Sequence, residues 1–92
     1  MIQSFNCTAT ESLWQGERVP RFVNFASVAI RKLQQLHAAV ELGFLRVPPG
    51  NQLEALSGNR KGQHSIRIND QWRICFVWNA GHATQVEIVD YH

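Results

Sequence analysis

The sequence is poor in cysteine and has no long apolar run. Its only cysteines, Cys7 and Cys75, are too few for a disulfide scaffold and form no CxxC pattern, which predicts a reducing, cytoplasmic setting. No stretch approaches the ~18 apolar residues of a membrane span, and the first residues lack the basic start and apolar run of a signal peptide. We therefore expect a soluble, cytoplasmic protein without a membrane partner.

Motifs for metal binding and for a catalytic nucleophile are also lacking. The residue types that bind metals show no HxxH, HExxH or CxxC spacing, and the candidates are His64, His82, His92 and Cys75. Cys75 follows Arg73 in a predicted strand and has no obvious histidine neighbour to act as its base. The sequence therefore predicts no metal and no other cofactor, and it disfavours a cysteine hydrolase.

Acidic residues are scarce where the basic ones gather. A length of 92 residues with 45% apolar and 17% charged residues predicts one globular domain, residues 1–92. Between Ser57 and Trp78, four basic residues stand against the single acid Asp70, a local net charge of +3. They are Arg60, Lys61, Arg67 and Arg73. Such a field attracts phosphate, whereas a merely solvated strand face, the alternative, ordinarily mixes both signs.

The same stretch predicts a β-hairpin. Two alternating runs, 64–68 and 72–78, meet at Asn69-Asp70, and both of these residue types tolerate a tight reversal. The expected pairs on the apolar face are Ile68–Trp72, Ile66–Ile74 and His64–Phe76. On the other face Arg67 lies opposite Arg73. Like charges at this spacing cost stability, so we expect an anion from outside the hairpin to compensate them.

Two helices are expected before the hairpin. Thr8 and Glu11 have the spacing of a capping box, which predicts a short helix that ends at Gly16. Residues 22–40 carry apolar side chains with a helical period, namely Phe22, Phe25, Val28, Ala29, Leu33, Leu36 and Val40. Ile30 falls off this stripe, and we interpret it as an incidental surface residue.

The remaining strands complete an α+β fold. A last strand is expected at 84–91 after a turn at 79–82, and residues 1–5 are expected to form a short edge strand. Pairing Trp78 with His82 places Arg73 opposite Glu87. The N-terminal helices should pack on one face of this antiparallel β-meander.

The exposed face of the predicted sheet carries the candidate chemistry. It presents Arg67, Arg73, Glu87 and Tyr91, and the sequence closes with Asp90-Tyr91-His92. An arginine pair suits a phosphate and a histidine suits proton transfer near neutral pH. Strict alternation places His92 on the apolar side, so it reaches the arginines only if the strand twists or ends near Asp90.

Three segments, LSGNRKGQHSIRIN, WRICF and the final DYH, resemble the HigB-like toxins of bacterial toxin–antitoxin systems, within the RelE superfamily. The resemblance covers essentially the whole chain. It implies a RelE-like, microbial-ribonuclease-like fold and a ribosome-dependent messenger-RNA endonuclease that inhibits translation and growth. The implied partners are the ribosome and a HigA-like helix-turn-helix antitoxin, through which the toxin would reach operator DNA indirectly.

The resemblance also implies roles for individual residues. By position, Arg73 matches the arginine that binds the scissile phosphate, and Asp90, Tyr91 and His92 match active-site residues. Glu54, in QLEAL, matches a position where relatives place an acid/base or substrate-contacting group. The implied RNA-facing surface consists of Arg60, Lys61, His64 and Arg67. Attack by a 2′-hydroxyl on the adjacent phosphorus needs alignment, proton transfer and charge stabilisation, which side chains supply without a metal.

Two other classes of function stay open at this point. Related folds of the same superfamily resemble ParE, a protein-binding inhibitor of gyrase that cleaves no RNA. The third class is a non-catalytic RNA-binding module whose basic face only recognises phosphate. The basic hairpin and the DYH ending favour the ribonuclease branch.

Overall fold

The computed structural model describes residues 1–90 and contains two α-helices, four strands and four 3₁₀ turns. The helices are α1 (Thr8–Trp14) and α2 (Ala26–Ala38), and the strands are β1 (Glu54–Ala55), β2 (His64–Arg67), β3 (Trp72–Asn79) and β4 (His82–Asp90). The 3₁₀ turns are η1 (Pro20–Phe25), η2 (Leu42–Arg46), η3 (Pro49–Asn51) and η4 (Gly58–Arg60). The strands form one antiparallel sheet in the order β1-β2-β3-β4. The predicted α+β class is confirmed.

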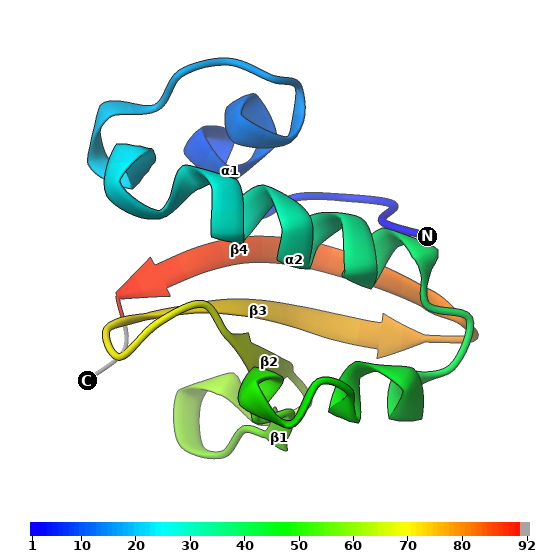
Figure 1. Ribbon diagram of the computed structural model, residues 1–92. Coiled ribbons are helices and arrows are strands. Elements are labelled where there is room, and N and C mark those ends of the chain that lie inside the picture. Colours follow the sequence, from blue (N-terminus) through cyan, green and yellow to red (C-terminus); the bar gives the residue numbers. More distant parts are fainter. Residues whose placement is uncertain (91–92) are drawn as a thin grey trace.

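Helix α2 packs its apolar stripe on one face of the sheet (Figure 1). Ala29, Leu33 and Leu36 are fully buried. The predicted start of this helix is wrong, because Pro20 opens a 3₁₀ turn that delivers Phe22 and Phe25 to the core before α2 begins. The predicted end at residue 40 is wrong as well, since α2 stops at Ala38.

Two residues near α2 differ from their predicted burial. Val40, placed on the apolar stripe by the sequence, lies beyond the helix and is 68% exposed. Ile30, interpreted as a surface residue, is half-buried and packs against the core. The exposure of Val40 follows from where the helix ends, because a residue beyond the last turn no longer keeps the helical stripe.

Helix α1 begins without the predicted capping box. Cys7 is its N-cap residue and has an extended backbone, and no side chain caps the helix. Thr8 is already the first helical residue, so its hydroxyl is not placed to serve the first turn. The predicted end is confirmed: Gly16 follows the C-cap with φ +92°, and its N–H donates to the Leu13 carbonyl at 3.0 Å.

The outer edge of β4 is covered by the N-terminal segment and α1. Residues 1–5 do not form the predicted strand but make two isolated parallel bridges, Ile2 with Ala83 and Phe5 with Val86. Thr10 of α1 is fully buried and its hydroxyl accepts a hydrogen bond from the Ile88 N–H at 2.9 Å. These contacts satisfy edge groups of β4 that would otherwise be open to pairing with another strand.

The β2–β3 hairpin has the predicted register. His64 pairs with Phe76, Ile66 with Ile74, and Arg67 with Arg73. The Asn69 side chain closes the turn by accepting hydrogen bonds from the N–H groups of Gln71 and Trp72, at 2.9 and 2.8 Å. Asparagine does this readily because its carbonyl reaches its own backbone two residues further along.

The predicted β3–β4 register is wrong by one residue near the turn and by two residues beyond the bulge. Asn79 pairs with His82, and a bulge between Cys75 and Val77 then shifts the ladder, so that Arg73 lies opposite Val89 and not Glu87. Gln85, on β4 at this irregularity, has φ +53°. Because side chains alternate with a period of two, the slip of two residues beyond the bulge leaves the side chains there on their predicted faces. Between the turn and the bulge the slip is one residue, and the buried Ala83 lies opposite Trp78.

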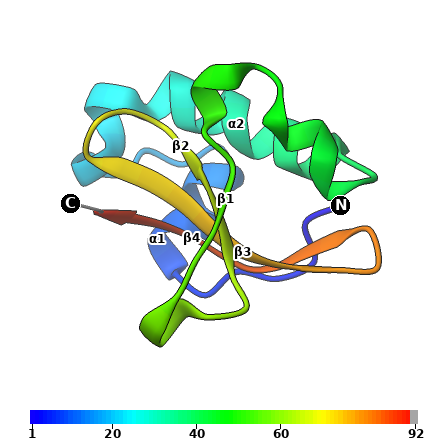
Figure 2. The same cartoon turned by 90° about the horizontal axis from the view of Figure 1, so that it is seen from below.

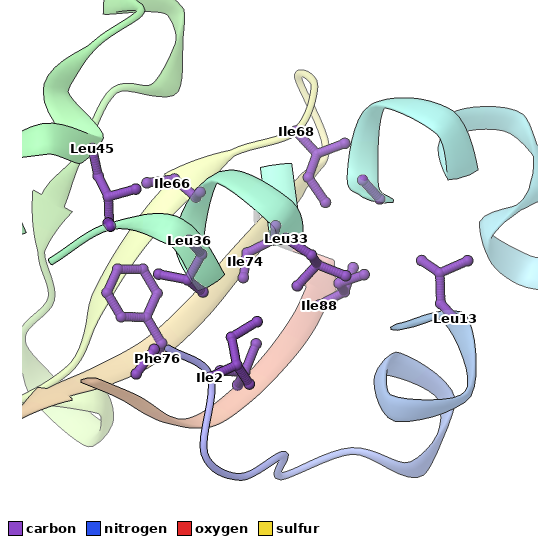
Figure 3. Close-up of a cluster of buried hydrophobic side chains, with 14 of the residues drawn as sticks. Ile2, Leu13, Leu33, Leu36, Leu45, Ile66, Ile68, Ile74, Phe76 and Ile88 are labelled. Carbon is purple, nitrogen blue, oxygen red and sulfur yellow. The ribbon is translucent and has the colours of Figure 1, made fainter. Parts of the chain in front are cut away.

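The two faces of the sheet differ in chemistry. The helix-covered face supplies buried apolar side chains, and Figure 3 shows Leu33 and Leu36 of α2 among Ile66, Ile74, Phe76 and Ile88. The opposite side, here called the charged face, carries Ser65, Arg67, Arg73, Cys75 and Glu87. None of the helices within residues 1–90 has the length and apolar character to cross a membrane.

Candidate functional site

A short strand that the sequence did not predict completes the charged face. Strand β1 has two residues, and its Glu54 pairs with Ser65 of β2. Ser65 pairs in turn with Cys75 of β3, and Cys75 pairs with Glu87 of β4. One row of side chains therefore crosses all four strands, with a carboxylate at each end.

Arg73 lies next to this row and is held by three groups. Its side chain is 10% exposed. Nε donates to the buried Ser65 hydroxyl at 2.8 Å, and Nη2 donates to the Gln52 carbonyl at 2.6 Å. The Glu54 carboxylate lies 3.6 Å from Nη2. A guanidinium fixed in this way presents a positive charge at a set position. Such a charge can stabilise the negative charge that develops on the oxygens of a reacting phosphate.

The Gln52 carbonyl points at Arg73 because of an unusual backbone. Gln52 follows η3 with φ +46° and ψ +53°, the left-handed region, so the chain reverses direction directly before β1. A non-glycine residue in this region costs about 1 kcal/mol or more. The hydrogen bond to the arginine accompanies this local strain, an association common at functional sites.

A second arginine reaches the row from the β1–β2 connection. Arg60, at the end of η4, donates to the Glu87 carboxylate at 2.7 Å and to the Gln63 side-chain carbonyl at 3.1 Å. The glycines on either side, Gly58 and Gly62, have φ of +63° and +96°. Figure 2 shows this connection projecting from the side of the sheet opposite to α2.

The predicted clash between the opposed arginines is relieved by protein carboxylates. Arg67 is paired with Asp70 in the hairpin turn, and Arg73 lies beside Glu54. An external anion, expected from the sequence, is not needed for this purpose. Arg60 forms an ion pair with Glu87, so three of the four basic residues that gave the local charge of +3 have an acidic partner. The fourth, Lys61, is exposed.

Cys75 lies in the middle of these charges and is fully buried. Burial raises the pKa of its thiol, and this outweighs the neighbouring guanidinium groups of Arg60 and Arg73, which lower it. A thiol in this state is neutral and a poor nucleophile. The structure therefore agrees with the sequence in giving Cys75 a packing role.

The other predicted site residues lie apart from this cluster. His64 is on the helix-covered face, half-buried and stacked on Phe76 at a centroid distance of 6.2 Å. Asp90 is exposed at the end of β4, opposite Trp72, and accepts a hydrogen bond from the Gln71 amide at 3.0 Å. Tyr91 and His92 lie outside the described residues.

Sequence reasoning overlooked two groups that hold Arg73. By alternation Ser65 lies on the same face as Arg67 and Arg73. A short hydroxyl side chain beside these two arginines was the available signal. The Gln52 carbonyl had no signal, because a backbone group carries no residue type. Within residues 1–90, no three side chains of the histidine, cysteine and carboxylate types gather in a metal-binding arrangement.

Comparison of the sequence with known proteins finds similarity to one family. A family model described as "RelE-like toxin of type II toxin-antitoxin system HigB" matches residues 12–92. Toxin HigB-1 of Vibrio cholerae is 40% identical over 83 residues, which cover 88% of this chain and 87% of that protein. An uncharacterized protein of Haemophilus influenzae is 38% identical over 55 residues, 60% of this chain and 54% of that protein.

Solved structures share the fold at low sequence identity. YafQ from E. coli, as a point mutant, superposes with a TM-score of 0.60 and 14% identity, over 98% of this chain and 91% of YafQ. The YoeB–YefM complex from Staphylococcus aureus contains a chain with a TM-score of 0.59 and 21% identity, over 100% of this chain and 95% of that one. At these identities the likeness establishes the fold alone.

Proposed function

The chain belongs to the HigB-like toxins, RelE-like proteins of type II toxin–antitoxin systems, and from this membership we propose that it is an endoribonuclease that cuts messenger RNA on the ribosome. The observation that carries the proposal is the fixed guanidinium of Arg73 on the charged face, with Arg60 and Arg67 nearby on the same face. Phosphate groups are the ligands that such a surface suits best.

In the proposed reaction the 2′-hydroxyl of one nucleotide attacks the adjacent phosphorus, and the 5′-oxygen of the next nucleotide leaves. Negative charge grows on the non-bridging oxygens as the new P–O bond forms. Arg73 supplies the matching positive charge, and Ser65 and the Gln52 carbonyl keep it in place. Arg60, Lys61 and Arg67 hold the phosphates next to the scissile one.

Two proton transfers accompany this displacement. One proton leaves the attacking hydroxyl and one reaches the departing oxygen. Glu54 is 3.6 Å from Arg73 and 48% exposed, so it lies beside the proposed phosphate site and is open to solvent. We assign one transfer to Glu54 or Asp90 and the other to His92, and base stacking to Tyr91. The roles of Asp90, Tyr91 and His92 rest on the family resemblance.

The partners follow from the same membership. A toxin of a type II system is neutralised by an antitoxin, and YoeB, which has a similar fold, has been solved in complex with YefM. For this chain we propose a HigA-like antitoxin with a helix-turn-helix domain, which would bring the pair to operator DNA. We propose that the toxin acts in the cytoplasm, where ribosomes and messenger RNA are available. We propose also that residues 1–92 form a single toxin domain.

The test is induction of the chain in a bacterial host with primer-extension mapping of an abundant messenger. We expect cuts inside translated codons for the wild type and none for Arg73→Ala. The matched control is Arg18→Ala, which removes an exposed arginine from the α1–η1 connection and should cut like the wild type. Circular dichroism and antitoxin binding are the measurements that show whether Arg73→Ala is folded, and we expect both to match the wild type.

Two results would contradict the proposal. Arrested growth with intact messengers and inhibited DNA supercoiling would identify a ParE-like gyrase inhibitor. Salt-sensitive RNA binding without any cleavage on translating ribosomes would identify a non-catalytic RNA-binding module.

A further inference from the structure

A cleft lies on the other side of the molecule from the charged face, between α2 and the segment that leads to η3. It has a volume of about 440 Å³ and is lined by Arg31, Lys32, Gln34, Gln35 and Pro48. Figure 2 shows this segment beside α2, on the side of the sheet that the helix covers. The proposed cleavage reaction uses none of these residues.

A buried amide, that of Asn51, fixes two of the residues that line the cleft, Lys32 and Gln35. Asn51 is fully buried, and its side-chain nitrogen donates to the Leu45 carbonyl at 3.1 Å and to the Gln35 side chain at 3.0 Å. Its side-chain oxygen accepts a hydrogen bond from the Lys32 ammonium. Gln35 in turn donates to the Val47 carbonyl at 2.5 Å. The ammonium group is therefore held at the wall of the cleft in a preformed position.

Positive charge collects at this wall. Burial lowers the pKa of Lys32, and the neighbouring charges of Arg31 and Arg67 lower it further. Arg31 is exposed and forms no ion pair with another side chain of residues 1–90. Arg31 and Lys32 are therefore neighbouring cations on the wall of the cleft, and Arg67, although paired with Asp70, adds to the positive field at Lys32. A bound anion would relieve this repulsion.

The segment 51–54 joins this cleft to the charged face around the edge of β2. Asn51 holds Lys32 on one side of the sheet, while the Gln52 carbonyl and the Glu54 carboxylate hold Arg73 on the other. Strand β1 pairs only with His64 and Ser65. Arg67 therefore stands beyond the end of β1, between the cleft and the proposed scissile phosphate.

We propose that the cleft is a second binding site for RNA backbone phosphate, which holds the messenger strand after it passes from Arg73 over Arg67. The inference rests on the proposed function and extends its substrate path. Arg31 and Lys32 contact the phosphate, and the ring of Pro48 packs against the sugar. Because phosphate contacts fix a strand without reading its bases, this site orients the messenger and leaves codon choice to other groups.

The test is binding of a short fluorescein-labelled single-stranded RNA with 2′-O-methyl sugars, which cannot be cut by its own 2′-oxygen. Anisotropy is measured over a salt series. We expect Arg31→Gln to weaken binding about fivefold at low salt and to reduce the slope of log K against log salt by about 0.7, one phosphate contact. Lys32→Gln should act in the same direction, and Arg18→Gln should match the wild type.

The loss should be equal for uridine-rich and adenosine-rich strands, because a backbone contact is blind to sequence. Arg31→Gln with wild-type affinity and slope would overturn the proposal, as would a wild-type chain that does not bind the RNA. If the Arg31→Gln variant bound RNA like the wild type but was no longer neutralised by the antitoxin, the cleft would be assigned to the protein partner, which would also overturn the proposal. Messenger cleavage by the wild type is scored separately, so the proposed function stands or falls on its own result.

Discussion

The Glu54 carboxylate lies 3.6 Å from the Arg73 guanidinium, although strand β2 separates the two strands that carry them. The arginine crosses this distance by running over Ser65, whose hydroxyl accepts from Nε. Arg73 thereby connects three strands and the connection that precedes β1. The proposed phosphate site is therefore a product of tertiary structure. Arg73 comes from β3, Ser65, which anchors it, from β2, and Glu54 from β1.

Arg73→Lys is expected to lose about 10²- to 10³-fold in cleavage rate. Lysine keeps the positive charge, but a point-like ammonium cannot serve Ser65 and the Gln52 carbonyl at once and still face a phosphate. Single-turnover cleavage of messenger on programmed ribosomes measures the effect. A lysine variant with the wild-type rate would show that charge alone suffices.

Ser65→Ala is expected to destabilise the fold by about 1–3 kcal/mol, because it leaves Arg73 Nε without its buried acceptor. Urea denaturation gives the free energy of unfolding. Ser27→Ala, at an exposed position of α2, is the matched control and should stay within about 0.5 kcal/mol of the wild type. Since Ser65 positions Arg73, the same variant should lower kcat with little change in KM. Unchanged kcat would contradict the positioning role.

The Arg60–Glu87 pair is expected to show a coupling energy of about 0.5–1 kcal/mol in a double-mutant cycle. Both side chains are partly shielded from water, at 32% and 16% exposure, and the pair ties the η4 turn to β4. The comparison is the Arg67–Asp70 pair, whose carboxylate is 99% exposed and whose coupling should be smaller. Equal coupling energies in the two cycles would mean that shielding from water does not decide the strength of these ion pairs.

The two thiols are expected to differ sharply toward a thiol reagent. At Cys7, burial raises the pKa, but hydrogen bonds to Thr10 and Ala9 and the charge of Arg21 outweigh it and lower the pKa overall. Burial raises the pKa of Cys75. Because the thiolate reacts, Cys7 should label at pH values where an ordinary thiol is still protonated, and Cys75 only after unfolding. Labelling of Cys7→Ser and Cys75→Ser variants across a pH series assigns each rate, and labelling of folded Cys75 would refute the prediction.

The hairpin could be predicted because all of its determinants are local. Strict alternation fixes which side chains share a face, and Asn69 closes the turn with its own side chain, so the pairing of Arg67 with Arg73 follows from counting along the chain. The helix-covered face could be predicted for the same reason. The family resemblance pointed to Arg73 and Glu54, which the structure brings together.

Other features depend on contacts between distant segments. The two-residue strand β1 exists only because β2 offers it an edge. The β3–β4 register is set by a bulge at Cys75–Val77, with Gln85 on β4 in a left-handed conformation, and nothing in the local sequence marks it. The expected capping box at Thr8 has the right spacing, but the chain enters α1 at Cys7.

By itself the sequence determined the α+β class, the faces of the hairpin and the concentration of basic residues beside it, because these depend on periodicity and composition. The tertiary structure decided how the charges are used. It placed Glu54, Ser65 and the Gln52 carbonyl around Arg73 and paired Arg60 with Glu87. Hydrogen bonds and ion pairs act over a few ångströms, so the fold had to bring these groups together before any of them acquired its partner.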